Sequence, residues 1–135
     1  MSRKLTLISA PAGFGKTTLL SEWRMMHLGS EYPVAWVSLE EADNDPTRFL
    51  SYLISALQAI EVDAGKAVLA SLRSPQPPIE SGLTALVNEI AAIPKDFALV
   101  LDDYHAIANE AVHDMIAFLL NHLPLQAHLI VATLP

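Results

Sequence analysis

The chain has 135 residues, of which 52% are hydrophobic and 17% are charged, and it contains no cysteine. One well-packed domain fits this length and composition, whereas a disordered chain, a disulfide framework and a thiolate metal site do not. The net charge of -7 leaves no basic stripe for nucleic-acid phosphates, so we expect no direct nucleic-acid binding by this segment. No apolar run approaches the roughly 20 residues of a membrane helix, and we expect no membrane contact and a cytoplasmic location.

The first informative stretch is Lys4 to Leu20, a predicted phosphate-binding loop between a strand and a helix. Leu5 to Ile8 is a short apolar run of the kind that forms a buried strand. It is followed by APAGFGKT, which has the phosphate-loop (Walker A) spacing of a small residue, four positions, then Gly, Lys and Thr. Glycine adopts the backbone angles that aim successive N–H groups at a phosphate. Helical spacing predicts that Thr17 to Met26 follows as a helix, whose first N–H groups and positive dipole end attract the anion.

Lys16 is expected to reach the β and γ phosphates, and the Thr17 hydroxyl is expected to bind Mg²⁺. The residues assigned to nucleotide contact in this loop are Ala12, Gly13, Phe14, Gly15, Lys16, Thr17 and Thr18. The first loop position is Ala10 rather than glycine, which leaves less backbone freedom at the start of the turn. The alternative interpretation is a glycine-containing turn with an exposed lysine.

The second informative stretch is Phe97 to Asp103, which reads FALVLDD. Five apolar residues and two carboxylates predict a buried parallel strand that brings acids to its carboxyl end, where ligands bind in open α/β sheets. Beside a phosphate loop, this is the Walker B pattern: Asp102 would hold Mg²⁺ together with Thr17, and Asp103 would polarise the attacking water. The alternative is an acidic strand end that meets solvent.

Apolar periodicity and capping residues predict the remaining elements. Asp45 is placed to cap a helix that has Pro46 at its first position and an apolar stripe from Phe49 to Ile60. The other expected helices cover residues 63–73, 82–93 and 111–123, and the other expected strands cover residues 34–39 and 128–133. The acidic residues before Pro46 lack calcium-loop spacing, so loop and capping roles are favoured over a metal site.

Three segments of the chain together resemble one known family: SAPAGFGKTTL, VAWVSLEEADNDPTRFLSYLISALQ and VLDDYHAI. They look like the N-terminal nucleotide-binding domain of the large ATP-dependent LuxR-type transcription regulators, which are P-loop NTPases of the STAND class. The resemblance covers nearly the whole chain, and the segment NDPTRF is more specific to this family than the phosphate loop is. It implies an α/β three-layer sandwich with a mostly parallel sheet and an ASCE/AAA-like P-loop core, in a single domain over residues 1–135.

The resemblance also implies ATP and Mg²⁺ as cofactors, a switch reset by slow hydrolysis, and C-terminal sensor and DNA-binding domains in a longer protein. It places the strand ending at Thr133 between the phosphate-loop strand and the Asp102 strand, so that Thr133 faces the γ-phosphate. Family members usually continue with arginine, whereas this chain has Leu134, which puts hydrolysis more in doubt than binding. The family's fifth strand and lid are expected to be missing here, which leaves the Leu5 to Ile8 strand on an unpaired edge that favours self-association.

The leading functional hypothesis is an ATP-binding switch module with weak ATPase activity at most. A small-metabolite kinase is one alternative, but such enzymes usually carry catalytic arginines, and only Arg48 and Arg73 follow the first helix. A degenerate P-loop scaffold without nucleotide binding is the other alternative, which the presence of Lys16, Thr17 and Asp102 disfavours.

Overall fold

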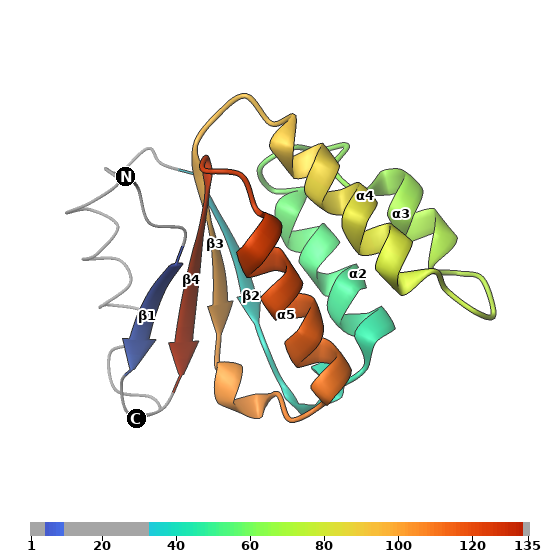
Figure 1. Cartoon of the computed structure of the whole chain (residues 1–135), viewed down its shortest axis with the longest axis horizontal. Helices are drawn as coiled ribbons and strands as arrows, with labels where there is room; N and C mark the ends of the chain where they lie inside the picture. Colours follow the sequence, from blue (N-terminus) through green and yellow to red (C-terminus); the bar gives the residue numbers. More distant parts are fainter. Residues whose placement is uncertain (1–4, 10–32, 134–135) are drawn as a thin grey trace.

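The computed structural model describes residues 5–9 and 33–133. In this part of the chain, four strands form one parallel sheet in the order β1-β4-β3-β2 (Figure 1). The strands are β1 (Leu5–Ser9), β2 (Val34–Ser38), β3 (Phe97–Asp102) and β4 (Ala127–Thr133). The α-helices are α2 (Pro46–Leu57), α3 (Lys66–Ser71), α4 (Ile79–Ala91) and α5 (Glu110–His122), and the short 3-10 helices are η1 (Glu41–Asp43) and η2 (Tyr104–Ala106). The fold is therefore α/β, as predicted.

The sheet order confirms that the strand ending at Thr133 lies between the strand before the phosphate-loop sequence and the strand of Asp102. β4 pairs with β1 on one side and with β3 on the other, in register from Leu5 opposite Leu129 to Ser9 opposite Thr133. β4 is the only neighbour of β1 among the strands that the structure describes, so β1 is the edge of this sheet. The self-association inferred from that edge stays a prediction.

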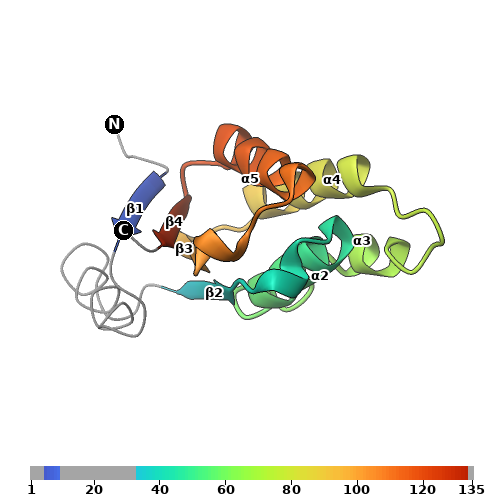
Figure 2. The ribbon, with the colours of Figure 1, turned by 90° about the horizontal axis from the view of Figure 1, so that it is seen from below.

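The described helices pack on one face of the sheet, where they bury the main hydrophobic core (Figures 1 and 2). Alternation along the strands sends every second side chain to this face. The strand residues in the core are Ala35, Val37, Phe97, Leu99, Leu101, Ala127, Leu129 and Val131. They meet the apolar stripes of α2, α4 and α5, whose fully buried members include Phe49, Leu53, Leu86, Ile90 and Leu119.

The opposite face of the sheet holds a second, smaller apolar cluster. Its buried members are Ala98, Val100, Ile130 and Ala132, and Val34 and Trp36 pack against them. β3 is consequently buried on both faces, as its uninterrupted apolar sequence predicted. None of the described helices packs on this second face. The helix predicted from Thr17 to Met26, and with it the third layer, lies outside the described residues.

Two helices begin three residues away from their predicted starts, and α5 begins one residue early, at Glu110. α4 begins at Ile79 instead of Gly82, because a helix accepts Pro78 at its start, where no N–H is needed, and the Gly82 N–H donates to the Pro78 carbonyl at 2.8 Å. α3 is shorter than the predicted segment 63–73, because Gly65 interrupts it in a left-handed conformation with φ 71°. The predicted cap of α2 is confirmed, since the Asp45 carboxylate accepts from the Thr47 N–H at 3.0 Å.

We expect Gly65→Ala to destabilise the protein by about 1–3 kcal/mol, because an L side chain is strained in the left-handed region. A Cβ there would also lie 2.7 Å from Ile54 Cγ2 and 3.3 Å from Leu86 Cδ1. Equilibrium urea unfolding measures the change. Gly82→Ala is the matched control: this glycine is helical, so an alanine there meets a tight contact of 3.1 Å with Val68 Cγ1 but no backbone strain. An equal or larger loss in Gly82→Ala would contradict the conformational argument.

Candidate functional site

Each of the four described strands has a polar last residue, and these residues form a row at the carboxyl edge of the sheet. Ser9 of β1 lies opposite Thr133 of β4, and Ser38 of β2 lies opposite Asp102 of β3. Because Leu101 pairs with Val131, Asp102 and Thr133 end adjacent strands within one residue of each other in register. Neighbouring strands lie about 4.8 Å apart. The sequence APAGFGKT therefore continues from an edge strand that ends two strands, or about 10 Å, from Asp102.

Asp102 is buried, with 7% of its surface exposed, although it ends a strand. Its Oδ1 accepts a hydrogen bond from the Asp103 N–H at 2.8 Å. Asp103 itself adopts a left-handed conformation, φ 57° and ψ 41°, and is the one described residue other than glycine with positive φ. Aspartate tolerates this region better than most residues, but the conformation is still uncommon. β3 consequently ends at Asp102, one residue before the predicted end, and the chain turns away from the sheet at Asp103.

Asn44 links the loop after β2 to the segment after β3. Its Nδ2 donates to the carbonyl oxygens of Glu41 and Ala106, at 3.0 Å in both cases. Its Oδ1 accepts from the backbone N–H groups of Ala108 at 2.6 Å and Asn109 at 2.7 Å. The amide thus uses both donors and two acceptor positions. The three residues contacted after β3 lie between the Asp103 turn and α5, so Asn44 fixes the segment that leads away from the candidate acids.

The residues that flank Asn44 in the chain form a turn held by ion pairs. The Asp43 side chain is fully buried, and its carboxylate accepts from the Glu40 N–H at 2.9 Å and from Arg48 Nε at 3.3 Å. Arg48 also pairs with Glu40 through a contact of 3.1 Å between Nη2 and Oε1. A buried carboxylate requires such partners to offset its desolvation. Arg48 and Asp43 therefore hold η1 in shape, which agrees with the loop and capping roles predicted for this acidic stretch.

Tyr104 of η2 contacts His113 of α5 and so links the two elements. Its hydroxyl shares a hydrogen bond with Nδ1 of His113, and the two rings meet edge to face with centroids 5.3 Å apart. Burial raises the pKa of Tyr104 above its ordinary value of 10.0. At the start of the same helix, the Asn109 side chain accepts from the Val112 N–H at 3.1 Å and caps α5. The turn after Asp103 is thus held by Asn44, which follows η1, and by His113 of α5.

The structure brings together those predicted site residues that it describes, and it adds one. Asp102, Asp103 and Thr133 gather at the carboxyl edge of β3 and β4. The predicted loop contacts from Ala12 to Thr18, with Lys16 and Thr17 among them, lie outside the described residues. The sequence did not reveal Asn44 as a linking residue. Asn44 is nevertheless the first residue of NDPTRF, the segment that most specifically resembles the regulator family. A polar residue beside a capping Asp-Pro pair was the available signal.

We expect Asn44→Ala to abolish the hydrogen-exchange protection of the Ala108 and Asn109 amides, because both lose their acceptor. Net loss of these hydrogen bonds should lower global stability by about 1–3 kcal/mol. Exchange measured by NMR or mass spectrometry gives the first effect, and urea unfolding gives the second. Asn88→Ala, at an exposed position of α4, is the control and should change neither quantity. Unchanged protection at Ala108 and Asn109 in Asn44→Ala would show that the link has no importance in solution.

The arrangement defines an α/β protein with a parallel sheet whose carboxyl edge carries a buried aspartate, a second acid and a threonine. Comparison with known proteins is more specific. A protein of Cronobacter sakazakii named HTH-type transcriptional regulator MalT is 42% identical over 129 residues, which are 90% of this chain and 13% of that protein. Proteins of the same name from Klebsiella pneumoniae and Yersinia pestis are 40% and 37% identical, over 95% and 98% of this chain. The chain is therefore homologous to one segment of the MalT-type LuxR-family regulators, as the resemblance indicated.

The match concerns a small part of those regulators. The chain spans 13–14% of the length of the MalT proteins. No protein-family model matches it. In the part of the chain that the structure describes, no helix is long and apolar enough to cross a bilayer.

Proposed function

We propose that the chain is the Mg-ATP-binding switch module of a MalT-like transcriptional regulator. The observation that carries the proposal is the row of polar residues at the carboxyl edge. The phosphate-loop sequence follows directly after Ser9, and Asp102 ends a parallel strand two positions away in the same sheet. Open α/β sheets bind ligands outside the carboxyl ends of their strands.

The available side chains suit magnesium. Mg²⁺ prefers oxygen ligands, and in nucleotide sites it takes one or two from the protein beside phosphates and water. Asp102 offers a carboxylate at the edge, and Thr17 in the loop sequence offers a hydroxyl. When bound, Mg²⁺ would neutralise charge on the β and γ phosphates. Lys16 would hold the same phosphates, and Thr133, which ends β4 between the two strands, would lie beside the γ-phosphate.

Asp103 is the proposed group for orienting the attacking water. Strained backbone conformations at the edge of a site are a common feature of functional residues. The left-handed turn at Asp103 is held in place by Asn44 and by the contact between Tyr104 and His113. Leu134 stands where the family usually has arginine, so we propose binding with slow hydrolysis at most. This rate suits a switch better than a metabolic enzyme.

The parent protein is proposed from the homologues, which are named HTH-type transcriptional regulator MalT. In such a protein the DNA-binding and sensing functions would belong to segments outside this chain, consistent with the net charge of -7. Bound nucleotide would favour one arrangement of the neighbouring domains only if it contacts that arrangement better than the other.

Isothermal titration calorimetry of the chain with Mg-ATP, Mg-ADP and ATP in excess EDTA tests the proposal. We expect saturable binding of both Mg-nucleotides and clearly weaker binding when Mg²⁺ is chelated, followed by phosphate release too slow for a metabolic enzyme. Fast phosphate transfer to an added metabolite would instead identify a kinase. The absence of binding by the folded chain would leave a scaffold without nucleotide function.

A further inference from the structure

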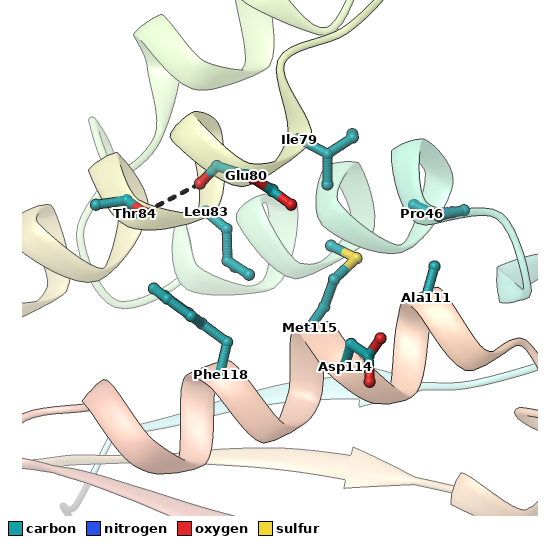
Figure 3. A pocket seen from close by; sticks show the side chains of 9 residues that line it. All are labelled: Pro46, Ile79, Glu80, Leu83, Thr84, Ala111, Asp114, Met115 and Phe118. Atoms are coloured by element: carbon teal, nitrogen blue, oxygen red, sulfur yellow. Dashed lines mark hydrogen bonds between the residues drawn. The ribbon is translucent and has the colours of Figure 1, made fainter.

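A pocket distinct from the carboxyl edge opens on the outer side of the helical layer. It has a volume of about 610 Å³ and lies between the first residue of α2, the first two turns of α4 and the first three turns of α5 (Figure 3). The residues that line it are Pro46, Ile79, Glu80, Leu83, Thr84, Ala111, Asp114, Met115 and Phe118. Its volume falls within the range of roughly 300–1,000 Å³ that is usual for small-ligand sites. The floor is apolar, since Leu83 and Met115 are buried and Ile79 and Phe118 are half-buried.

The walls of this pocket are acidic. Glu80 from α4 and Asp114 from α5 carry carboxylates on opposite sides of the apolar floor (Figure 3). No basic residue lines the pocket, and within the described part of the chain neither carboxylate takes part in a salt bridge. Arg48 is engaged by Glu40 and Asp43, and Lys66 by Asp63. A ligand would therefore have to bring its own positive charge.

We propose that this pocket binds a small amphipathic cation, with an aryl or alkyl body and a terminal ammonium or guanidinium group. The body would displace water from Leu83, Met115 and Phe118, and the cation would lie between Glu80 and Asp114. Thr84 adds a third polar contact: its hydroxyl donates to the Glu80 carbonyl at 3.0 Å and keeps its lone pairs for a ligand N–H. Helices enclose the pocket on three sides, and ligand sites are commonly concave and apolar with a few placed polar groups.

Binding can be followed through Met115 by NMR of the chain labelled at its methionine methyl groups, with the signal assigned from Met115→Leu. The probe is 4-phenylbutylammonium, and the matched ligand is 4-phenylbutyrate, which has a similar body and the opposite charge. We expect the ammonium to shift the Met115 signal in a saturable way and the carboxylate to leave it unchanged. Equal binding of both ligands would overturn the role of charge, and binding of neither would overturn the site.

Matched variants locate the cation. The double variant Glu80→Gln/Asp114→Asn should bind the ammonium about three- to tenfold more weakly at low ionic strength, as expected for partly exposed charge pairs. Glu61→Gln/Asp96→Asn removes the same charge from positions outside the pocket and should bind as the unchanged chain does. Equal weakening in both pairs would indicate attraction by net charge only. A lysine-containing amphipathic peptide that shifts Met115 while the free amine does not would identify a docking surface and overturn a small-ligand site. None of these measurements involves nucleotide, so their results test the pocket independently of the proposed function.

Discussion

Lys16→Ala is expected to weaken Mg-ATP binding about 10- to 100-fold, which is the effect of losing a hydrogen bond between charged groups in a phosphate site. The lysine is the one loop side chain that can place a full positive charge against the β and γ phosphates. Its removal should leave the fold intact, because phosphate contact and not core packing is its predicted role. Calorimetric titration at fixed ionic strength measures the change.

Lys95→Ala is the matched control for Lys16→Ala. Lys95 is exposed and lies just before β3, at the opposite edge of the sheet from Asp102. Both variants lower the positive charge by one, so a general electrostatic effect on the nucleotide would weaken binding equally in the two proteins. Loss of affinity in Lys16→Ala alone supports a phosphate contact. Undiminished binding in Lys16→Ala would show that the glycine-rich sequence is an ordinary turn.

Phe49→Ala is expected to lower the free energy of unfolding by about 3–5 kcal/mol, the usual result of deleting a buried aromatic ring. Phe49 is fully buried on the core face of α2. A loss of this size is a large fraction of the roughly 5–15 kcal/mol that stabilises a typical domain. Equilibrium urea unfolding followed by circular dichroism measures the change.

Tyr52→Ala provides an aromatic control in the same helix. Tyr52 lies three residues further along α2 and is 37% exposed, so its truncation should change stability by less than about 1 kcal/mol. Similar losses in the two variants would contradict the orientation of α2. A Phe49→Ala protein that is as stable as the unchanged chain would contradict the burial of the main core.

The elements that were predicted correctly are those whose position is determined by neighbouring residues in the sequence. The uninterrupted apolar run at Phe97 predicted a strand buried on both faces, and Asp45 with Pro46 predicted the start of α2 at Pro46. α4 was predicted to begin at Gly82, three residues after its start at Ile79. In the structure this glycine lies inside the helix, where a side chain would press on Val68 of α3. The packing of α3 against α4 thus accounts for a glycine inside a helix.

The remaining features depend on contacts between distant residues. Asn44 bonds to backbone groups 62–65 positions later in the chain, and nothing in the EEADNDP stretch reveals those partners. The pocket between α2, α4 and α5 is likewise assembled from three separate helices. The position of β4 between β1 and β3 came from the family resemblance, because apolar periodicity identifies strands but not their order.

The most direct test of the central claim is to find where the metal-nucleotide binds, by adding Mn-ATP in place of Mg-ATP and recording the backbone amide signals. Paramagnetic broadening falls steeply with distance. We predict the strongest broadening at Asp102, Asp103 and Thr133, and much weaker broadening at Phe97 and Ala127, which lie about 16–20 Å from them at the other ends of the same strands. Broadening centred on Phe97 and Ala127, or none at saturating Mn-ATP, would contradict a nucleotide site at the carboxyl edge of this sheet.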